Sequence, residues 1–270
     1  MDTGLQDKVV LVTGASGGIG GAAARLFDRE GAVLVLHGYR NLGNLHALQE
    51  ELTGDNVLVS ADLTQEEEVE HLFRKALDRF RRVDILVATA GIWPPEDEPI
   101  HRMTLERWNR TIATDLTSVF LCARAFFRTL ERTKPESAAL VIVGSTAAVF
   151  GEEGHADYAA AKAGITYGLT RTLKNEIVRI VPRGRVNAVC PGWTRTPMSA
   201  AGLADPAVVT RVLQTRAHTR VARPEDVASA IVFLSSDRLA GHITGEILAV
   251  AGGMEGRLLH LPEEVNPREA

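Results

Sequence analysis

Short runs of apolar residues recur along the chain, separated by stretches in which apolar positions follow helical spacing. The runs are continuous rather than alternating, as in strands that helices cover on both faces of a parallel sheet. Seven strands are predicted, at residues 9–12, 32–36, 57–59, 83–87, 140–143, 185–189 and 246–250. The clearest helices are predicted at residues 19–30, 45–52 and 65–80. This alternation with short links predicts an α/β fold with one doubly wound parallel sheet of about seven strands and helices on both faces.

The composition fits one globular domain and argues against several other classes of protein. No linker or internal repeat divides the 270 residues, and the net charge of −4 with scattered basic residues gives no reason to expect nucleic acid as a partner. The histidines and cysteines form no metal-binding motif, and Cys122 and Cys190 suit a reducing compartment. The chain starts without a signal-peptide pattern and has no apolar run of membrane-spanning length. We therefore expect a cytoplasmic protein without a metal site or a membrane partner.

A glycine-rich turn, Thr13–Gly20, joins the first strand to the first helix with the spacing Gly14-x3-Gly18-x-Gly20. Backbone amides and the positive end of the helix dipole suit a diphosphate there, and glycines allow it to approach closely. The turn alone also fits a tight structural connection or a protein that binds S-adenosylmethionine. Its place in a strand-helix-strand unit favours a dinucleotide.

Three polar residues, Ser145, Tyr158 and Lys162, are spaced 13 and then 4 residues apart. Residues four apart share one face of a helix, so Lys162 can stabilise the phenolate of Tyr158. A phenol whose pKa of about 10 is lowered in this way becomes a usable general acid/base. Alone, the pair would also fit a surface helix with a chance spacing.

Together these features resemble the short-chain dehydrogenase/reductase family over residues 7–253, most closely its 3-oxoacyl-carrier-protein reductase branch. The matching motifs are Thr13–Gly20, Asp62-Leu63, Ser145, Tyr158-x-x-x-Lys162, the segment 187–192 with Thr196, the segment 223–228, and Thr244-Gly245. The resemblance implies a Rossmann-type fold and an oxidoreductase that transfers a hydride between a nicotinamide dinucleotide and a carbonyl or secondary alcohol.

The resemblance also implies roles for individual residues. Tyr158 would exchange the proton with the substrate oxygen, Ser145 would polarise that oxygen, and Lys162 would lower the pKa of Tyr158 and hold the nicotinamide ribose. Asp115 stands where the family usually has the Asn of a proton relay and is included among the catalytic residues. The residues expected to bind the cofactor are Gly14, Ser16, Gly17, Gly18, Ile19, Gly20, Arg40, Asp62, Leu63, Ala90, Gly91, Tyr158, Lys162, Pro191, Gly192, Thr194 and Thr196.

Two departures from the family pattern lie near these residues. Ala88-Thr89 replaces a common Asn-Asn pair, which we interpret as local repacking. Asp115 keeps the backbone carbonyl of the usual Asn, and an ionised carboxylate there would favour the charged form of Lys162. Both changes leave room for a second hypothesis, a catalytically silent dinucleotide-binding protein, against which the intact Ser145, Tyr158 and Lys162 argue.

The second strand ends without an acidic residue, and Arg40 follows it. An acid there would bind the adenosine ribose and favour NAD, whereas an arginine suits the 2′-phosphate of NADP. Arg40 also fits a solvated loop residue, and Gly17 stands where NADP enzymes often have a basic residue. We expect NADP(H) rather than NAD(H).

Substrate and assembly are less constrained by the sequence. Residues 1–253 are expected to form the catalytic domain, with a substrate lid at about 193–221 and a C-terminal extension at 254–270. The substrate is expected to be a small carbonyl or alcohol, including a carrier-linked acyl group, with a sugar or polyol dehydrogenase using NAD as the alternative. Glu152, Glu153 and His155 could meet a polar substrate, although a solvated or ion-paired role is favoured, and Trp93 and Trp193 could line an apolar slot or simply pack. A homotetramer or homodimer is expected through an apolar face at Val119, Phe120, Phe126 and Phe127, a spacing that fits a core stripe equally well.

Overall fold

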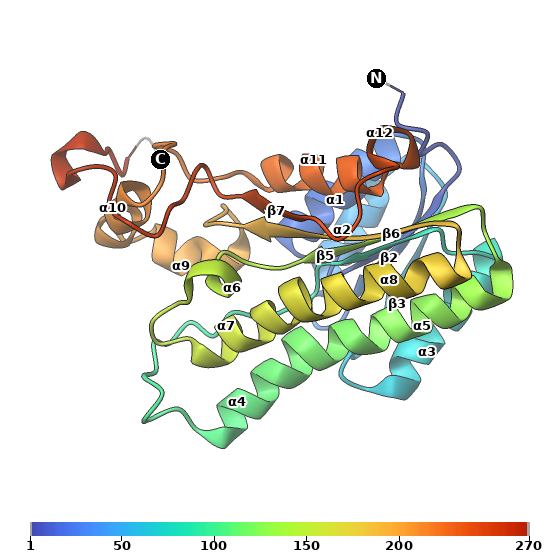
Figure 1. Cartoon of the computed structure of the whole chain (residues 1–270), viewed down its shortest axis with the longest axis horizontal. Coiled ribbons are helices and arrows are strands. Elements are labelled where there is room, and N and C mark those ends of the chain that lie inside the picture. Colours follow the sequence, from blue (N-terminus) through green and yellow to red (C-terminus); the bar gives the residue numbers. More distant parts are fainter. Residues whose placement is uncertain (1, 269–270) are drawn as a thin grey trace.

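The computed structural model describes residues 2–268, and the predicted apolar runs form one parallel sheet (Figure 1). Its strands are β1 (Val9–Thr13), β2 (Val33–Gly38), β3 (Asn56–Ser60), β4 (Ile85–Ala88), β5 (Ser137–Val143), β6 (Arg183–Pro191) and β7 (Ile247–Val250). Their spatial order is β3-β2-β1-β4-β5-β6-β7, and every neighbouring pair is parallel. The order reverses between β1 and β4, so a crevice is expected at the carboxyl ends of these strands.

Helices cover both faces of the sheet, and each face has its own apolar cluster. The first face carries α1 (Gly18–Arg29), α2 (Leu42–Glu51) and α11 (Pro224–Ser235). The other carries α3 (Glu66–Phe80), α5 (Ser118–Thr133) and α8 (Thr170–Ile180) (Figure 1). The doubly wound α/β fold predicted from the continuous apolar runs is therefore confirmed.

Two of these helices continue segments that reach the crevice. The helix α4 (Leu105–Ile112) passes through a π-helical turn, η1 (Ala113–Thr117), into α5. The helix α7 (Ala156–Ala163) likewise passes through the π-helical turn η2 (Gly164–Leu169) into α8. The remaining short elements are α6 (Ala147–Phe150), η3 (Pro197–Ser199), α9 (Ala200–Leu203), α10 (Pro206–Gln214), α12 (Asp237–Ala240) and η4 (Pro262–Glu264).

The strand β6 contains two buried polar side chains that have hydrogen-bond partners in other elements. In β6, Arg185 donates to the carbonyl oxygens of Leu234 and Ser235 at the end of α11. Asn187 donates to the carbonyl oxygen of Ile243. Such tertiary partners allow polar residues in a buried strand.

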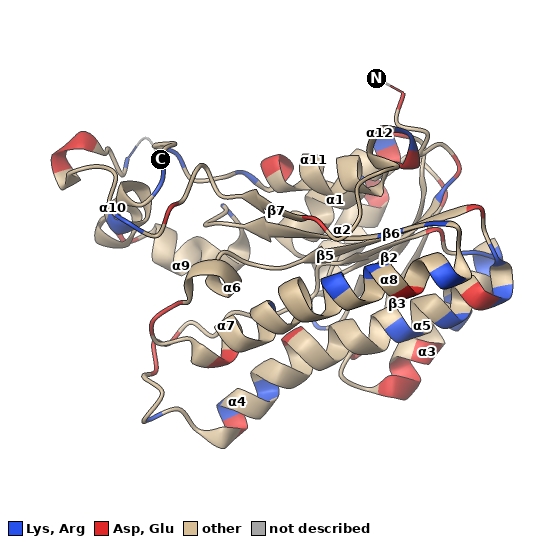
Figure 2. Ribbon diagram, viewed as in Figure 1, with Lys and Arg blue, Asp and Glu red and all other residues tan. Residues whose placement is uncertain are grey.

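The helix α5 explains most of the apolar face that we considered for subunit contact. Val119 and Phe126 are buried in the core, and Phe127 packs against it, so these three belong to a core stripe. Phe120 remains 44% exposed, beneath the guanidinium of Arg124. Charges of both signs are interspersed on the outer helices (Figure 2).

The tail after Gly253 folds back on its own chain. The amide of Leu259 donates to the carbonyl oxygen of Gln214 at the end of α10, and Val265 packs with Val209 and Leu213 of that helix. No helix within residues 2–268 has the length and apolar character that a membrane crossing requires.

Candidate active site

A cavity of about 710 Å³ opens at the carboxyl ends of the central strands. It contains the predicted site residues from the glycine turn, from the ends of β2 to β6 and from α7. Every predicted catalytic or cofactor residue lines it except Asp115, which is buried beneath it. Within residues 2–268, no group of three or more His, Cys, Asp or Glu side chains could hold a metal ion.

The glycine turn packs so tightly that side chains are excluded at two positions. Gly14 has φ of +65°, and a Cβ there would lie 2.9 Å from the Cα of Ala90. A Cβ on Gly20 would lie 2.4 Å from the carbonyl oxygen of Gly14. No side chain caps the N-terminus of α1, whose first turn has no acidic residue. The unpaired amides and the dipole of this helix therefore fit a diphosphate.

A buried histidine, which sequence reasoning missed, holds the turn in place. His37 lies at the end of β2 and is 2% exposed. Its Nδ1 accepts from the amide of Gly14 at 3.1 Å, and its Nε2 faces the carbonyl oxygen of Ala61 at 2.9 Å. Burial lowers the pKa of His37, which favours the neutral tautomer that carries its proton on Nε2. The one feature of the sequence that could have indicated His37 is that a polar residue ends the apolar run of the second strand.

At the Ala88-Thr89 departure, Thr89 is hydrogen-bonded to Thr13 at the end of β1. The Thr13 hydroxyl accepts from the amides of Thr89 and Ala90, and the Thr89 hydroxyl donates to the carbonyl oxygen of Thr13 at 2.7 Å. These bonds tie the β4 loop to the glycine turn, in agreement with local repacking.

Ser145, Tyr158 and Lys162 meet at the other end of the cavity. Ser145 follows β5 and accepts from the amide of Ala147 at 3.1 Å, and Tyr158 and Lys162 lie one turn apart on α7. The Nζ of Lys162 is buried, lies 5.6 Å from the centre of the Tyr158 ring and donates to the carbonyl oxygen of Val143 at 3.2 Å. A cation, a phenol and a hydroxyl therefore converge on one part of the cavity wall.

The pKa of Tyr158 differs from the expectation that Lys162 would lower it. Burial raises the pKa of the phenol, the charge of Lys162 and the hydroxyl of Ser145 lower it, and Asp115 and Glu152 raise it further. The pKa of Tyr158 is therefore raised above its ordinary value. Lys162 thus acts in the predicted sense, but desolvation and two acidic neighbours outweigh it.

Asp115 lies in the π-helical turn η1 and completes this group from below. Its Oδ1 accepts from the amide of Ile92 at 2.8 Å, and its Oδ2 lies 3.5 Å from the Nζ of Lys162. Burial raises the pKa of Asp115 more than Lys162 lowers it. Burial also acts to lower the pKa of Lys162, but Asp115 and Tyr158 raise it above its ordinary value. The carboxylate therefore stabilises the charged form of Lys162, as expected for an acid at this position.

At the far end of the cavity, Arg40 lies beside Tyr39 and Asp62. The Arg40 guanidinium carbon is 5.3 Å from the centre of the Tyr39 ring. Desolvation acts to raise the pKa of Asp62, but hydrogen bonds from Thr64 and Tyr39 and the charge of Arg40 lower it. A cation and a fixed carboxylate therefore both line this end of the cavity.

The wall nearest Tyr158 has a second group of side chains. The indole Nε1 of Trp93 donates to Oε1 of Glu152 at 2.9 Å, and Trp193 meets the Trp93 ring edge-on at 6.2 Å. Glu152, Trp93 and Trp193 line the cavity. His155 stacks on Trp93 at 4.8 Å but is 1% exposed, so the possibility that it meets substrate is wrong.

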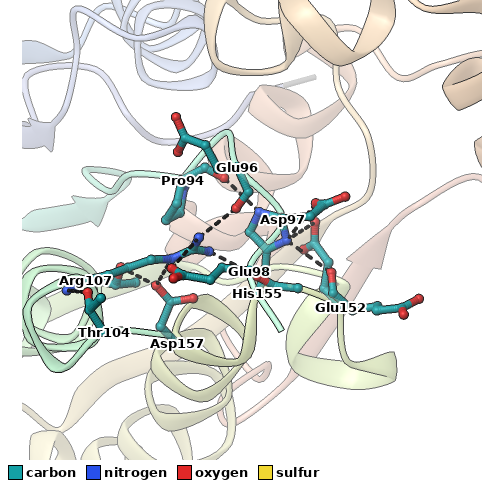
Figure 3. A network of polar contacts seen from close by, with 12 residues as sticks. Pro94, Glu96, Asp97, Glu98, Thr104, Arg107, Glu152, His155 and Asp157 are labelled. Carbon is teal, nitrogen blue, oxygen red and sulfur yellow. Dashed lines mark hydrogen bonds and ion pairs between the residues drawn. The ribbon is translucent and has the colours of Figure 1, made fainter. Parts of the chain in front are cut away.

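A buried arginine joins the two loops that carry this wall (Figure 3). Arg107 of α4 donates to the carbonyl oxygens of Glu96 and Gly154 and to the carboxylate of Asp157. Asp157 also accepts from the hydroxyl of Thr111 at 2.7 Å. The loops that contain Trp93 and Glu152 are thus fixed to the same helix.

Comparisons with known proteins agree with the fold and the motifs. Residues 14–255 match the family model described as enoyl-(acyl carrier protein) reductase. The chain is 38% identical to a 3-oxoacyl-[acyl-carrier-protein] reductase from Synechocystis sp., with 93% of this chain and 98% of the relative covered. It is 40% identical to cis-4-hydroxycyclohexanecarboxylate dehydrogenase from Sinomonas cyclohexanicum, with 94% and 98% covered. The crystal structure of levodione reductase superposes with a TM-score of 0.85 at 27% identity, covering 92% of this chain and 97% of that one. The chain belongs to the short-chain dehydrogenase/reductase family of oxidoreductases.

Proposed function

We propose that the protein is an NADP(H)-dependent reductase of a small carbonyl compound, or the dehydrogenase of the corresponding secondary alcohol. The observation that carries this proposal is the convergence of Ser145, Tyr158 and Lys162 in the cavity that also contains the glycine turn. Oxidation of NADPH in the presence of acetoacetyl thioesters, aldoses and simple ketones tests it. Failure to turn over any carbonyl or alcohol with either nucleotide would contradict it.

The side chains divide the work of reduction between them. A dinucleotide bound along the glycine turn would supply the hydride, and the protein supplies position and electrostatics. Tyr158 donates its phenolic proton to the carbonyl oxygen, and the Ser145 hydroxyl donates a hydrogen bond to the same oxygen as negative charge develops there. The Lys162 ammonium, held in its charged form by Asp115, stabilises the phenolate that Tyr158 becomes.

The choice of NADP(H) depends on Arg40. The Arg40→Ala variant is expected to bind NADPH about tenfold or more weakly, because a charged hydrogen bond to the 2′-phosphate contributes roughly 1.5–3 kcal/mol. Affinity for NADH should stay the same, since NADH has no 2′-phosphate. Titration of the thermal midpoint with each nucleotide measures both affinities. Full NADPH affinity in the variant would remove Arg40 as a phosphate ligand.

The charge of Asp115 should appear in the pH dependence of alcohol oxidation, which needs the Tyr158 phenolate. Asp115 raises the pKa of Tyr158, so Asp115→Asn should lower it and move the acidic limb of kcat/KM to lower pH. Asp115 Oδ2 lies 3.5 Å from Lys162 Nζ, which lies 5.6 Å from the centre of the Tyr158 ring, and at an effective dielectric constant of about 20 charges this close support a shift of roughly one pH unit or more. Superimposable pH–rate profiles of the parent and the variant would exclude the effect.

Several finer features are part of the same proposal. The substrate is a small molecule, including a carrier-linked acyl group, and the segment 193–221 acts as a lid over it. Trp193, Thr194 and Thr196 of that segment line the cavity, which supports a role in closure. Cys122 and Cys190 are free and buried, which suits the cytoplasm. Assembly as a homotetramer or homodimer stays a prediction.

A further inference from the structure

One carboxylate lines the cavity close to the reacting groups. Among the cavity-lining residues that the structure describes, the acidic ones are Asp62, beside Arg40, and Glu152. Glu152 lies near enough to Tyr158 for its charge to raise the pKa of the phenol. Glu152 lines the same cavity as Tyr158 and Ser145, so a substrate whose carbonyl oxygen meets those two residues shares the cavity with this carboxylate.

The two oxygens of Glu152 have different surroundings. Oε1 accepts from the Trp93 indole at 2.9 Å and lies 3.9 Å from Nδ1 of His155. Oε2 has no hydrogen-bond partner among residues 2–268 and is not among the side-chain atoms sealed from solvent. The carboxyl side chain is 28% exposed, on the cavity wall. One acceptor is thus used to fix the side chain, and the other remains available to a ligand.

The surroundings fix this carboxylate in place. The Nε2 of His155 faces the carbonyl oxygen of Pro94 at 2.7 Å, and its Nδ1 faces that of Glu153 at 3.2 Å. The ring of His155 in turn supports the Trp93 ring at an interplanar angle of 11°. With Arg107 joining the loops behind it, Glu152 meets a ligand with little loss of conformational freedom.

We propose that Glu152 makes the enzyme selective for carbonyl substrates that carry a hydroxyl group near the carbonyl, with the hydroxyl donating to Oε2. This inference rests on the proposed carbonyl reduction and adds the substrate class. Trp93 and Trp193 supply an apolar surface for the carbon skeleton, so a compact hydroxylated ketone fits better than a polar molecule without apolar faces. Burial raises the pKa of Glu152, and at pH values above that pKa its charge would repel a carboxylate on the substrate.

The test compares three ketones of similar size: 2-hydroxycyclohexanone, cyclohexanone and 3-oxocyclohexanecarboxylate. In the parent enzyme, kcat/KM for the hydroxy ketone should exceed that for cyclohexanone about tenfold, because hydrogen bonds to charged groups contribute about 1.5–3 kcal/mol. Glu152→Gln keeps an oxygen for Trp93, and the ratio should fall by about tenfold. The same variant should raise kcat/KM for the keto acid relative to cyclohexanone. Changes that act through Tyr158 affect all three ketones alike and cancel in these ratios.

The matched control is Glu153→Gln, the adjacent exposed carboxylate, which does not line the cavity and should leave both ratios unchanged. A second readout needs no turnover: quenching of tryptophan fluorescence by trans-1,2-cyclohexanediol and by cyclohexanol in the presence of NADP⁺. The diol should bind more tightly than cyclohexanol to the parent, and Glu152→Gln should remove the difference.

The outcomes separate this inference from the proposed function. An active enzyme in which Glu152→Gln leaves both substrate ratios at their parent values would overturn the role of Glu152 and leave carbonyl reduction standing. A protein that turns over no carbonyl but prefers the diol in a Glu152-dependent way would support the subsite while the proposed function fails. Equal binding of diol and cyclohexanol by the parent would overturn the subsite in either case.

Discussion

The Tyr158→Phe variant is expected to lose about three orders of magnitude in kcat/KM while it still binds NADPH. Phenylalanine keeps the ring in its place on α7 but cannot donate or accept the proton, and positioned proton transfer contributes about 10²–10⁴-fold to rate. Steady-state reduction of the best ketone measures the loss, and the rise of the thermal midpoint with NADPH measures binding.

Tyr167→Phe is the matched control for that experiment. Tyr167 lies in η2, is partly exposed beneath Arg171 and does not line the cavity, so its variant should keep the parent rate. A Tyr158→Phe protein that keeps a tenth or more of the parent activity would show that another group exchanges the proton.

Loss of Arg107 should have the largest effect on stability. In the Arg107→Met variant, Asp157 stays buried with the Thr111 hydroxyl as its remaining side-chain partner, and breaking a buried ion pair on one side costs about 3–5 kcal/mol. Urea unfolding at pH 7, followed by tryptophan fluorescence, measures the difference. Arg128→Met is the control, because the ion pair of Arg128 with Glu70 is half exposed and should contribute less than about 1 kcal/mol.

The stability difference should also depend on pH. Desolvation acts to raise the pKa of Asp157, but the hydrogen bonds from Thr111 and Arg107 and the Arg107 charge lower it. A depressed folded-state pKa stabilises the fold above the unfolded pKa, and this contribution is lost as pH falls through the folded value. The Arg107→Met deficit should therefore be largest near neutral pH and smaller in acid. A deficit as small as that of Arg128→Met, or one that grows in acid, would contradict this account.

The sheet could be predicted from the sequence because each buried parallel strand is a continuous apolar run. The ends of the strands were predicted less well: β6 was expected at residues 185–189 but spans Arg183–Pro191, because it pairs with Ser137 of β5 at one end and with Val250 of β7 at the other. These partner residues are about 50 residues away in the sequence, so the local sequence around β6 does not indicate them.

The candidate site was predictable where chemistry follows fixed spacing. The glycine turn and the Tyr158–Lys162 pair are local motifs, and both line the cavity. His37 contacts the glycine turn from β2, and Trp93 and Glu152 lie in separate loops, so no fixed spacing in the sequence indicates either contact. The net rise in the pKa of Tyr158 could not be predicted from the sequence either, because it depends on burial and on the acidic residues around the phenol.

A π-helical turn lies between the site end and the packed end of each of the two long helical segments, η1 between α4 and α5 and η2 between α7 and α8. One turn contains Asp115, and the other begins two residues after Lys162. A π turn holds about one residue more than the α turn it replaces. Removing a single residue from 113–117 would therefore leave α4 and α5 in their present rotational register on either side, while displacing the carboxylate between them. A difference of one residue in length at this turn could thus change how Lys162 is held without changing the fold. An engineered one-residue deletion would have the same effect.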